Sequence, residues 1–462
     1  MASQQALQDR FARNIVFVLR VCLADAADAL GPLLGAVGGA GARAGEIKLT
    51  EYHHGHMVYD VQVFTTGDEQ MAAVRQAAAA VKGCQVLDVL DLAMETHRGG
   101  ACECRSRTPI RSNTDLRIVY TPGVARVCKA IQADPEKARE FTNISNKVAI
   151  ATNGTAILGL GDIGALAGLP VMEGKAAIFW EFVKISAEPI LIDTHDADEF
   201  IAVMEKLAVG FGAIQIEDVA APDCFRITRE LDRRLPIPVF HDDQHGTATI
   251  VLAGLLSALK KTGKDIKKVR CAISGAGAAG TAITEVLQIA GIDDVVLADR
   301  AGIIYRGRKE NMNSEKVALA ERTNKDNIKG TIADAMAGRD LLIGVSQPNI
   351  VSQEMVRSMA AEPIVFALAN PVSEISVAEA YQAGAAVAAD GRVMNNALAY
   401  PGIFRGALDS RARSITIDMM LAAANALAAA VPEGQLMPEM MDPATHQAVA
   451  AAVAKAAGGR HG

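Results

Sequence analysis

The feature that most constrains the fold is a run of glycines between a predicted strand and a predicted helix. Residues 268–274 form a short apolar pattern typical of a buried strand, and Gly-Ala-Gly-Ala-Ala-Gly follows at once at 275–280. A helical pattern then spans 281–290. Glycines placed in this way permit a tight turn and let a pyrophosphate approach the helix amino-terminus. The sequence therefore predicts a parallel α/β domain that binds a dinucleotide. The predicted contacts come from Gly275, Gly277, Ala278, Ala279 and Gly280.

The acid that ends the next predicted strand bears on which dinucleotide is bound. Asp299 would accept hydrogen bonds from ribose hydroxyls and repel a 2′-phosphate, which favours NAD. Arg300 follows directly and would offset that repulsion, so NADP stays open. Further strands are predicted to end near Ser346 and Asn370. Because ligands lie at the carboxyl ends of parallel strands, both side chains are expected to face the cleft, with Ser346 toward the cofactor.

Two other predicted strands each lead into a pair of carboxylates. The apolar run 213–216 precedes Glu-Asp at 217–218, and the run 237–240 precedes His-Asp-Asp at 241–243. Four carboxylates at the ends of buried strands are costly to hold unless a positive group lies between them. Oxygen-rich clusters of this kind suit Mg²⁺ or Mn²⁺. The alternative is that these acids cap helices or lie on the surface.

Composition excludes several classes of protein. The chain of 462 residues has a formal charge of -7 and no basic run, which argues against nucleic-acid binding. No apolar stretch is long enough to span a membrane, and residues 1–13 have no apolar signal core. Seven cysteines without framework spacing fit a reducing compartment, so we expect a cytoplasmic protein. Cys102 and Cys104, near His97, leave a zinc site open, although loop thiols are commoner without one.

The first ninety residues predict a small module of order βαββαβ, a ferredoxin-like arrangement. By element order this module resembles an ACT domain, a regulatory unit that binds small effectors and often pairs with a second copy. Histidines 53, 54 and 56 lie in a predicted hairpin turn. They could bind a metal, although a solvated hairpin tip is the favoured interpretation. The elements are predicted at 14–21, 25–37, 47–52, 57–64, 68–81 and 84–89.

The chain as a whole is predicted to be α/β, with the ferredoxin-like module followed by an α/β substrate domain and a Rossmann-type NAD(P)-binding domain. A segment rich in arginine and glycine, with Pro109, marks a linker. The predicted domains are 1–90 (ACT-like module), 91–112 (linker), 113–242 (substrate and catalytic domain, completed by 396–462) and 243–395 (dinucleotide-binding domain).

Three more motifs precede the carboxylates. Tyr-Thr-Pro-Gly at 120–123 forces a turn before the next helix, and Leu-Gly-Leu-Gly-Asp at 158–162 lets the backbone approach a ligand. Lys175 begins an apolar helical stretch at 176–183. Such a lysine usually extends its amine to solvent. A lysine buried in a cleft could instead act as a base, because desolvation lowers its pKa.

Taken together, these motifs resemble the malic enzymes in their shorter bacterial form. The resemblance covers about residues 109–410, and several motifs in fixed order make it specific. The motifs are 120–125, 158–162, 173–175, 217–218 and 242–248. The resemblance implies metal-dependent oxidative decarboxylation of L-malate to pyruvate and CO₂ with reduction of NAD or NADP.

The resemblance also implies roles for individual residues. Tyr120 would be the general acid and Lys175 the general base, with Asp242 influencing Lys175. Asn370 and Asn396 would contact malate, although both residue types are common in turns and caps. The metal ligands would be Glu217, Asp218 and Asp243.

The place of a substrate-binding arginine found in the long form of the family is taken here by Ala156 and Ile157. Another cation, from a neighbouring subunit, would then meet a malate carboxylate, and we expect a homodimer or higher homo-oligomer. Two alternatives stay open. One is a malolactic-type enzyme or plain hydroxy-acid dehydrogenase on the same scaffold, and the other is a non-catalytic NAD-binding effector sensor.

Overall fold

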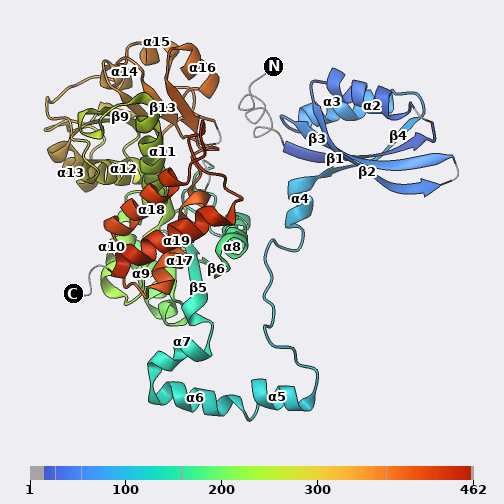
Figure 1. The fold of residues 1–462 in the computed structure, drawn as a ribbon, viewed down its shortest axis with the longest axis horizontal. Helices are drawn as coiled ribbons and strands as arrows, with labels where there is room; N and C mark the ends of the chain where they lie inside the picture. Colours follow the sequence, from blue (N-terminus) through green and yellow to red (C-terminus); the bar gives the residue numbers. More distant parts are fainter. Residues whose placement is uncertain (1–14, 27, 54, 158–159, 371, 459–462) are drawn as a thin grey trace. The chain divides into compact units, whose positions relative to one another are not determined.

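The computed structural model describes residues 15–458 except for 27, 54, 158–159 and 371. The predicted motif at 158–162 therefore lies partly outside the described residues, as does His54. The chain divides into two compact units, 1–103 and 104–462 (Figure 1).

The first unit is one antiparallel sheet with two helices packed on one face. The strands lie in the spatial order β2-β3-β1-β4. Along the chain the elements follow the order βαββαβ, as the sequence predicted. Alternate residues of β1 are buried against the helices, including Leu19 and Val21, because successive side chains of a strand point to opposite faces. The elements are β1 (Ile15–Ala24), α2 (Leu30–Gly39), β2 (Arg43–His53), β3 (His56–Thr65), α3 (Asp68–Ala79), β4 (Cys84–Asp91) and α4 (Leu92–His97).

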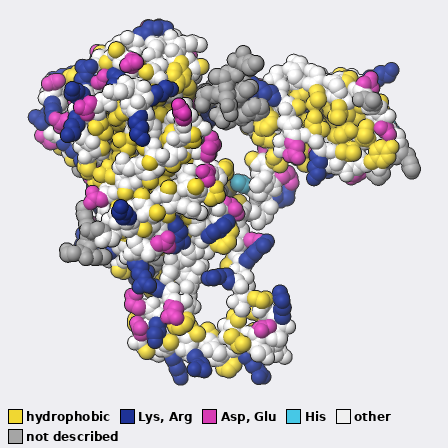
Figure 2. Space-filling view, in the orientation of Figure 1, with side chains coloured by type: hydrophobic (Ala, Val, Ile, Leu, Met, Phe, Trp, Pro, Cys, Tyr) yellow, Lys and Arg dark blue, Asp and Glu magenta, His cyan; other side chains and the backbone are white. Residues whose placement is uncertain are grey.

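Hydrophobic side chains also lie on the surface of the first unit. Figure 2 shows them gathered on the face of this unit that is turned toward the viewer. Its exposed large hydrophobic residues are Ile15, Ile47, Leu49, Tyr52, Leu87 and Met94. Contiguous apolar surface of this kind usually marks a binding face.

The second unit begins with an arm of short helices. These are α5 (Asn113–Val119), α6 (Val124–Ala133) and α7 (Ala138–Phe141), and none of their residues is buried. Exposed apolar side chains on the arm include Leu116, Ile118 and Phe141.

A four-stranded parallel sheet follows, in the order β6-β5-β7-β8. Alternate residues of β5 face two different cores, with Ile150 on one side and Ala151 on the other, so both faces of the sheet are covered. The strands are β5 (Lys147–Thr152), β6 (Ser186–Leu191), β7 (Ala213–Ile216) and β8 (Val239–His241). The helices between them are α8 (Leu169–Val183), α9 (Ala197–Leu207) and α10 (Asp223–Arg234).

The dinucleotide-binding region is a six-stranded sheet of order β11-β10-β9-β12-β13-β14, parallel except for β11. The strand order reverses direction between β9 and β12, which is where ligands bind in such sheets. The strands are β9 (Arg270–Ser274), β10 (Asp294–Asp299), β11 (Gly302–Ile303), β12 (Leu341–Gly344), β13 (Ile364–Ala367) and β14 (Val387–Asp390). The helices are α11 (Thr247–Thr262), α12 (Ala278–Ile289), α13 (Ser314–Arg322), α14 (Ile332–Met336), α15 (Gln353–Arg357) and α16 (Val377–Gln382).

Three carboxyl-terminal helices follow, of which the first and third pack against α8 and the second packs against α11. They are α17 (Tyr400–Asp409), α18 (Ile417–Ala429) and α19 (Pro443–Gly458). Phe179 of α8 meets Tyr400 and Phe404 of α17 edge to face, with ring centroids 5.0 and 5.3 Å apart. Aromatic pairs prefer this geometry, and here it joins α17 to the helix that carries Lys175. Within the described residues, no helix is long and apolar enough to cross a membrane.

Candidate active site

The site is built at the carboxyl ends of β7 and β8, which pair in parallel with Ile216 opposite His241. This pairing brings together the two pairs of acids that the sequence singled out. Carboxylate oxygens of Glu217, Asp218 and Asp243 lie within 4.8 Å of one another. Glu217 and Asp218 are buried, with 2% and 4% of their surface exposed.

The backbone at Asp218 is shaped for this cluster. Asp218 has a φ of 50°, in the left-handed region that non-glycine residues rarely adopt. Its N–H donates a hydrogen bond to Asp243 Oδ2 at 3.2 Å, which joins the two strand ends. Conformations of this kind are often found at functional sites.

Lys175 enters the cluster from α8. Its Nζ lies 2.6 Å from Glu217 Oε1 and also forms an ion pair with Asp242 Oδ2. Its side chain is 15% exposed, so it does not extend to solvent. Burial alone would lower the pKa of Lys175, but the negative charges of Asp242 and Glu217 outweigh burial and raise this pKa well above its ordinary value. In this arrangement the amine is held as an ammonium ion.

The carboxylates carry more negative charge than Lys175 can compensate. Burial, together with the neighbouring acids, raises the pKa of Glu217, and burial raises the pKa of Asp243. Gathered oxygen donors with raised pKa values fit a hard divalent cation. Among the described residues, only one group of three or more His, Cys, Asp or Glu side chains is close enough to hold one ion. Its members are Glu217, Asp218 and Asp243.

Two further side chains line this cluster. Asn396, a predicted substrate residue, donates from Nδ2 to Thr247 Oγ1 at 3.0 Å and to Asp242 Oδ2 at 3.3 Å. Tyr400, which the sequence reasoning did not assign, is 1% exposed and presents its ring to Lys175 Nζ at 4.8 Å from the ring centroid. Burial raises the pKa of Tyr400 above its ordinary value. The only sequence signal for Tyr400 was its place four residues after Asn396.

The structure does not bring every predicted residue into this cluster. Tyr120, at the end of α5, is 67% exposed. No hydrogen bond or ring contact joins its side chain to another described residue, and its role as general acid stays a prediction. Asn370 follows β13 and is exposed. Its side chain packs beside Gly391, where a Cβ would lie 3.2 Å from Asn370 Oδ1.

The dinucleotide loop has the predicted geometry. Gly275 has a φ of 115°, and a Cβ there would lie 2.5 Å from the carbonyl oxygen of Val345. At Gly280 a Cβ would lie 1.9 Å from the carbonyl oxygen of Gly275, so both positions require glycine. Helix α12 begins at Ala278, so the backbone N–H groups of its first turn are available at the place where a pyrophosphate is predicted to bind.

Asp299 ends β10 as predicted, and two cations that the sequence reasoning did not assign are its partners. Arg308 donates to its two oxygens at 2.6 and 2.7 Å, and Lys316 donates at 2.7 Å. These contacts outweigh the effect of burial and hold the pKa of Asp299 below its ordinary value. Arg300, which we expected to offset the charge of Asp299, is exposed. Sequence reasoning missed Arg308 and Lys316 because they follow after an intervening loop.

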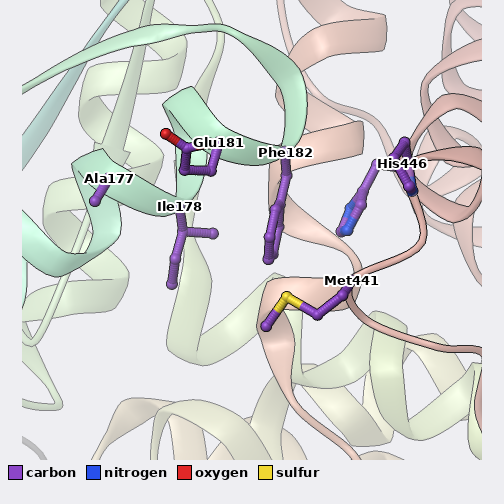
Figure 3. Close-up of a pocket in the computed structure, with 7 residues that line it drawn as sticks. Ala177, Ile178, Glu181, Phe182, Met441 and His446 are labelled. Atoms are coloured by element: carbon purple, nitrogen blue, oxygen red, sulfur yellow. The ribbon is translucent and has the colours of Figure 1, made fainter. Parts of the chain in front are cut away.

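A separate hollow of about 470 Å³ lies between α8 and the start of α19 (Figure 3). Phe182 and His446 stack on its wall with ring centroids 4.4 Å apart. None of the candidate catalytic residues lines it. The residues that do are Ala177, Ile178, Glu181, Phe182, Met441, Pro443 and His446.

The fold and the site together define a dinucleotide-dependent enzyme with a carboxylate-rich centre. Comparison with known proteins agrees with this class. Residues 101–232 match the amino-terminal domain of malic enzyme, and residues 244–394 and 391–458 match its NAD-binding domain.

Individual relatives cover most of the chain. An NAD-dependent malic enzyme from Geobacillus stearothermophilus is 45% identical over 408 residues, which are 87% of this chain and 84% of that protein. A bifunctional malic/malolactic enzyme from Bacillus subtilis is 46% identical over 368 residues, 78% of this chain and 90% of that protein. The solved structure of NAD-dependent malic enzyme from Thermotoga maritima has 41% identity and a TM-score of 0.76, covering 78% of this chain and 98% of the other. The chain therefore belongs to the malic enzyme family, the NAD(P)-dependent decarboxylating malate dehydrogenases.

Proposed function

We propose that the chain converts L-malate to pyruvate and CO₂ with Lys175 as the general base. The observation that supports this most strongly is the buried contact of Lys175 with Glu217 and Asp242, beside a three-carboxylate cluster. When bound, a divalent cation at Glu217, Asp218 and Asp243 would polarise the C2 oxygen of malate, and the nicotinamide would accept the hydride from C2.

The remaining steps belong to side chains of the protein. Lys175 Nζ removes the proton of the C2 hydroxyl, while Asp242 holds the amine in place. Loss of CO₂ then breaks the C3–C4 bond, and the Tyr120 hydroxyl donates a proton to C3. A cation at Glu217 would remove part of the negative charge that raises the pKa of Lys175, which makes the neutral amine accessible.

We infer that a second copy of the chain supplies Tyr120, because this side chain is 67% exposed within a single chain. The arm that carries it exposes apolar side chains at Leu116, Ile118 and Val119, and such a surface needs a partner. A dimer in which each arm covers the partner's site would bury these residues and bring Tyr120 to the partner's lysine. The same arrangement would bring other charged residues of the arm near malate, in place of the arginine missing at Ala156.

We propose NAD as the preferred cofactor, with NADP also accepted. Asp299 is present for the ribose hydroxyls, but Arg308 and Lys316 already neutralise it. With two cations against one carboxylate, the pocket does not repel a 2′-phosphate as a lone acid would.

The first unit is proposed as a regulatory module that binds a small effector. The βαββαβ fold and the apolar surface seen in Figure 2 support this assignment. A protein lacking residues 1–103 should keep malate turnover and lose any response to effectors. Loss of folding in that protein would show a structural role instead.

The function is tested by following absorbance of the reduced nicotinamide with L-malate, Mn²⁺ and either NAD or NADP. Reduction of the cofactor with stoichiometric pyruvate is the expected result. The malolactic alternative is favoured by one observation, the 46% identity to the bifunctional enzyme of Bacillus subtilis. Lactate as product, without net reduction of the cofactor, would establish that alternative. Absence of any turnover would favour the other alternative, a non-catalytic NAD-binding effector sensor.

A further inference from the structure

Glu374 is a buried acid in the same loop as Asn370, and it contacts the loop that follows β12. It lies between β13 and α16 and has 0% of its surface exposed. Its Oε1 accepts a hydrogen bond from the N–H of Ser346 at 2.7 Å, and its Oε2 accepts one from the N–H of Ala369 at 3.1 Å. The described residues form no ion pair with it. A fully buried carboxylate without a cation is costly, and such groups are retained where their contacts serve a purpose.

The neighbouring strand is adapted to this carboxylate. Gly344 ends β12, and a Cβ at this position would lie 2.4 Å from the carboxyl carbon of Glu374. An alanine at this position would displace the carboxyl group of Glu374. The glycine therefore leaves the space that this carboxyl group occupies.

The contacts of Glu374 reach the ends of three adjacent strands. Ser346 Oγ lies 2.8 Å from Ser274 Oγ, and Ser274 is the last residue of β9, directly before Gly275 of the dinucleotide loop. Ala369 directly precedes Asn370. One carboxylate thus connects the ends of β9, β12 and β13, which lie side by side in the sheet.

We propose that Glu374 is a positioning residue that sets the geometry of the dinucleotide loop relative to the substrate loop at Asn370. This proposal rests on the proposed function for the roles of Ser346 and Asn370. A carboxylate suits this place, because it accepts hydrogen bonds at once from Ser346 in the loop after β12 and from Ala369 in its own loop. A glutamine would present an N–H group to one of the two backbone N–H groups and lose that contact.

The test is the binding of NADH to the Glu374→Gln variant, measured by fluorescence titration without malate. Loss of one charge-assisted hydrogen bond is expected to raise the Kd of NADH about tenfold. The KM of malate should rise as well, because the substrate loop shifts with the cofactor loop. The matched control is Asp334→Asn, which weakens the cap of α14 in the same domain but touches neither loop. This control should bind NADH as the wild type does.

A merely structural role would give a different result. In that case Glu374→Gln would lower thermal stability, as the control does, while its folded fraction bound NADH with unchanged affinity, and the proposal would be overturned. If Glu374→Gln does not fold, Ser274→Ala removes the hydroxyl link between β9 and Ser346 and should still weaken NADH binding. Unchanged binding in that variant would also overturn the proposal. Normal NADH binding by a wild-type protein without malate turnover would count against the proposed function and not against Glu374.

Discussion

The amine of Lys175 lies 2.6 Å from Glu217 Oε1, in a place where both side chains are almost fully shielded from water. The pair joins the residue proposed as base to a residue proposed as metal ligand. Removing one partner of a buried ion pair leaves an uncompensated charge, which is strongly destabilising. Exchange of Glu217 between Lys175 and a divalent cation would therefore couple metal binding to the protonation of the base.

Replacing Lys175 with alanine should lower kcat by about 10² or more, the range of general-base catalysis. Steady-state kinetics with saturating malate and Mn²⁺ measure this effect. Lys206→Ala, on an exposed position of α9, is the matched control and should keep the wild-type kcat. Wild-type turnover in the Lys175 variant would exclude this residue as the base.

Replacing Asp243 with asparagine should weaken Mn²⁺ binding, because the cluster loses one of three negative charges that favour a cation. Calorimetric titration of the protein with Mn²⁺ measures the affinity directly, without turnover. Asp232→Asn, a half-buried acid on α10, serves as control and should bind Mn²⁺ normally. Equal affinities for the two variants would contradict the assigned metal site.

Mixing two inactive variants tests whether Tyr120 acts in a partner's site. Each mixed dimer of Tyr120→Phe and Lys175→Ala chains would contain one site with both residues intact. With random exchange in a symmetric dimer, activity should recover to about a quarter of the wild-type value. If Tyr120 serves its own chain, every site lacks one residue and mixing restores nothing. The activity of each variant assayed alone, without mixing, provides the baseline.

Replacing Lys316 with alanine should reduce the affinity for NADPH more than that for NADH. The variant removes a positive charge beside Asp299, which then repels a 2′-phosphate more strongly. Fluorescence titration with each reduced cofactor gives the ratio of Kd values. Lys309→Ala changes an exposed lysine seven residues away and should leave that ratio unchanged. A ratio unaffected by the Lys316 change would remove this residue from cofactor selection.

His446 should make stability depend on pH. Burial lowers the pKa of His446 below its ordinary value, although the Met440 carbonyl oxygen and Asp442 partly oppose this. The unfolded chain, with a pKa of about 6.5 for histidine, therefore binds the proton more readily than the folded chain. The contribution of His446 to stability is therefore complete at pH values above about 6.5, the pKa in the unfolded chain, and is lost as the pH falls below this value.

Chemical denaturation at several pH values measures this dependence. The His446→Gln variant should lose less stability on acidification than the wild type. His97→Gln, at an exposed position, should follow the wild-type curve. Identical curves for all three proteins would show that His446 does not titrate between the two states.

Much of the fold could be predicted because its signals are local. The glycines at 275–280 lie directly between a short apolar strand pattern and a helical pattern. The acids at 217–218 and 242–243 likewise follow directly after short apolar strands. The βαββαβ order of the first unit likewise followed from turns and periodicity. The division of the remaining chain into substrate and dinucleotide domains at residue 242 stays a prediction.

The sequence by itself determined the dinucleotide loop and the acids at the strand ends, since each depends on residues that are close in the chain. It also determined the family, since several short motifs in fixed order identify it. Only the tertiary structure decided that the Lys175 amine pairs with Glu217, that Lys316 and Arg308 neutralise Asp299, and that Glu374 joins three strand ends. It also decided that Tyr120 stays exposed in a single chain. The physical reason is that ion pairs and buried hydrogen bonds depend on distance in space, which packing sets and local patterns do not encode.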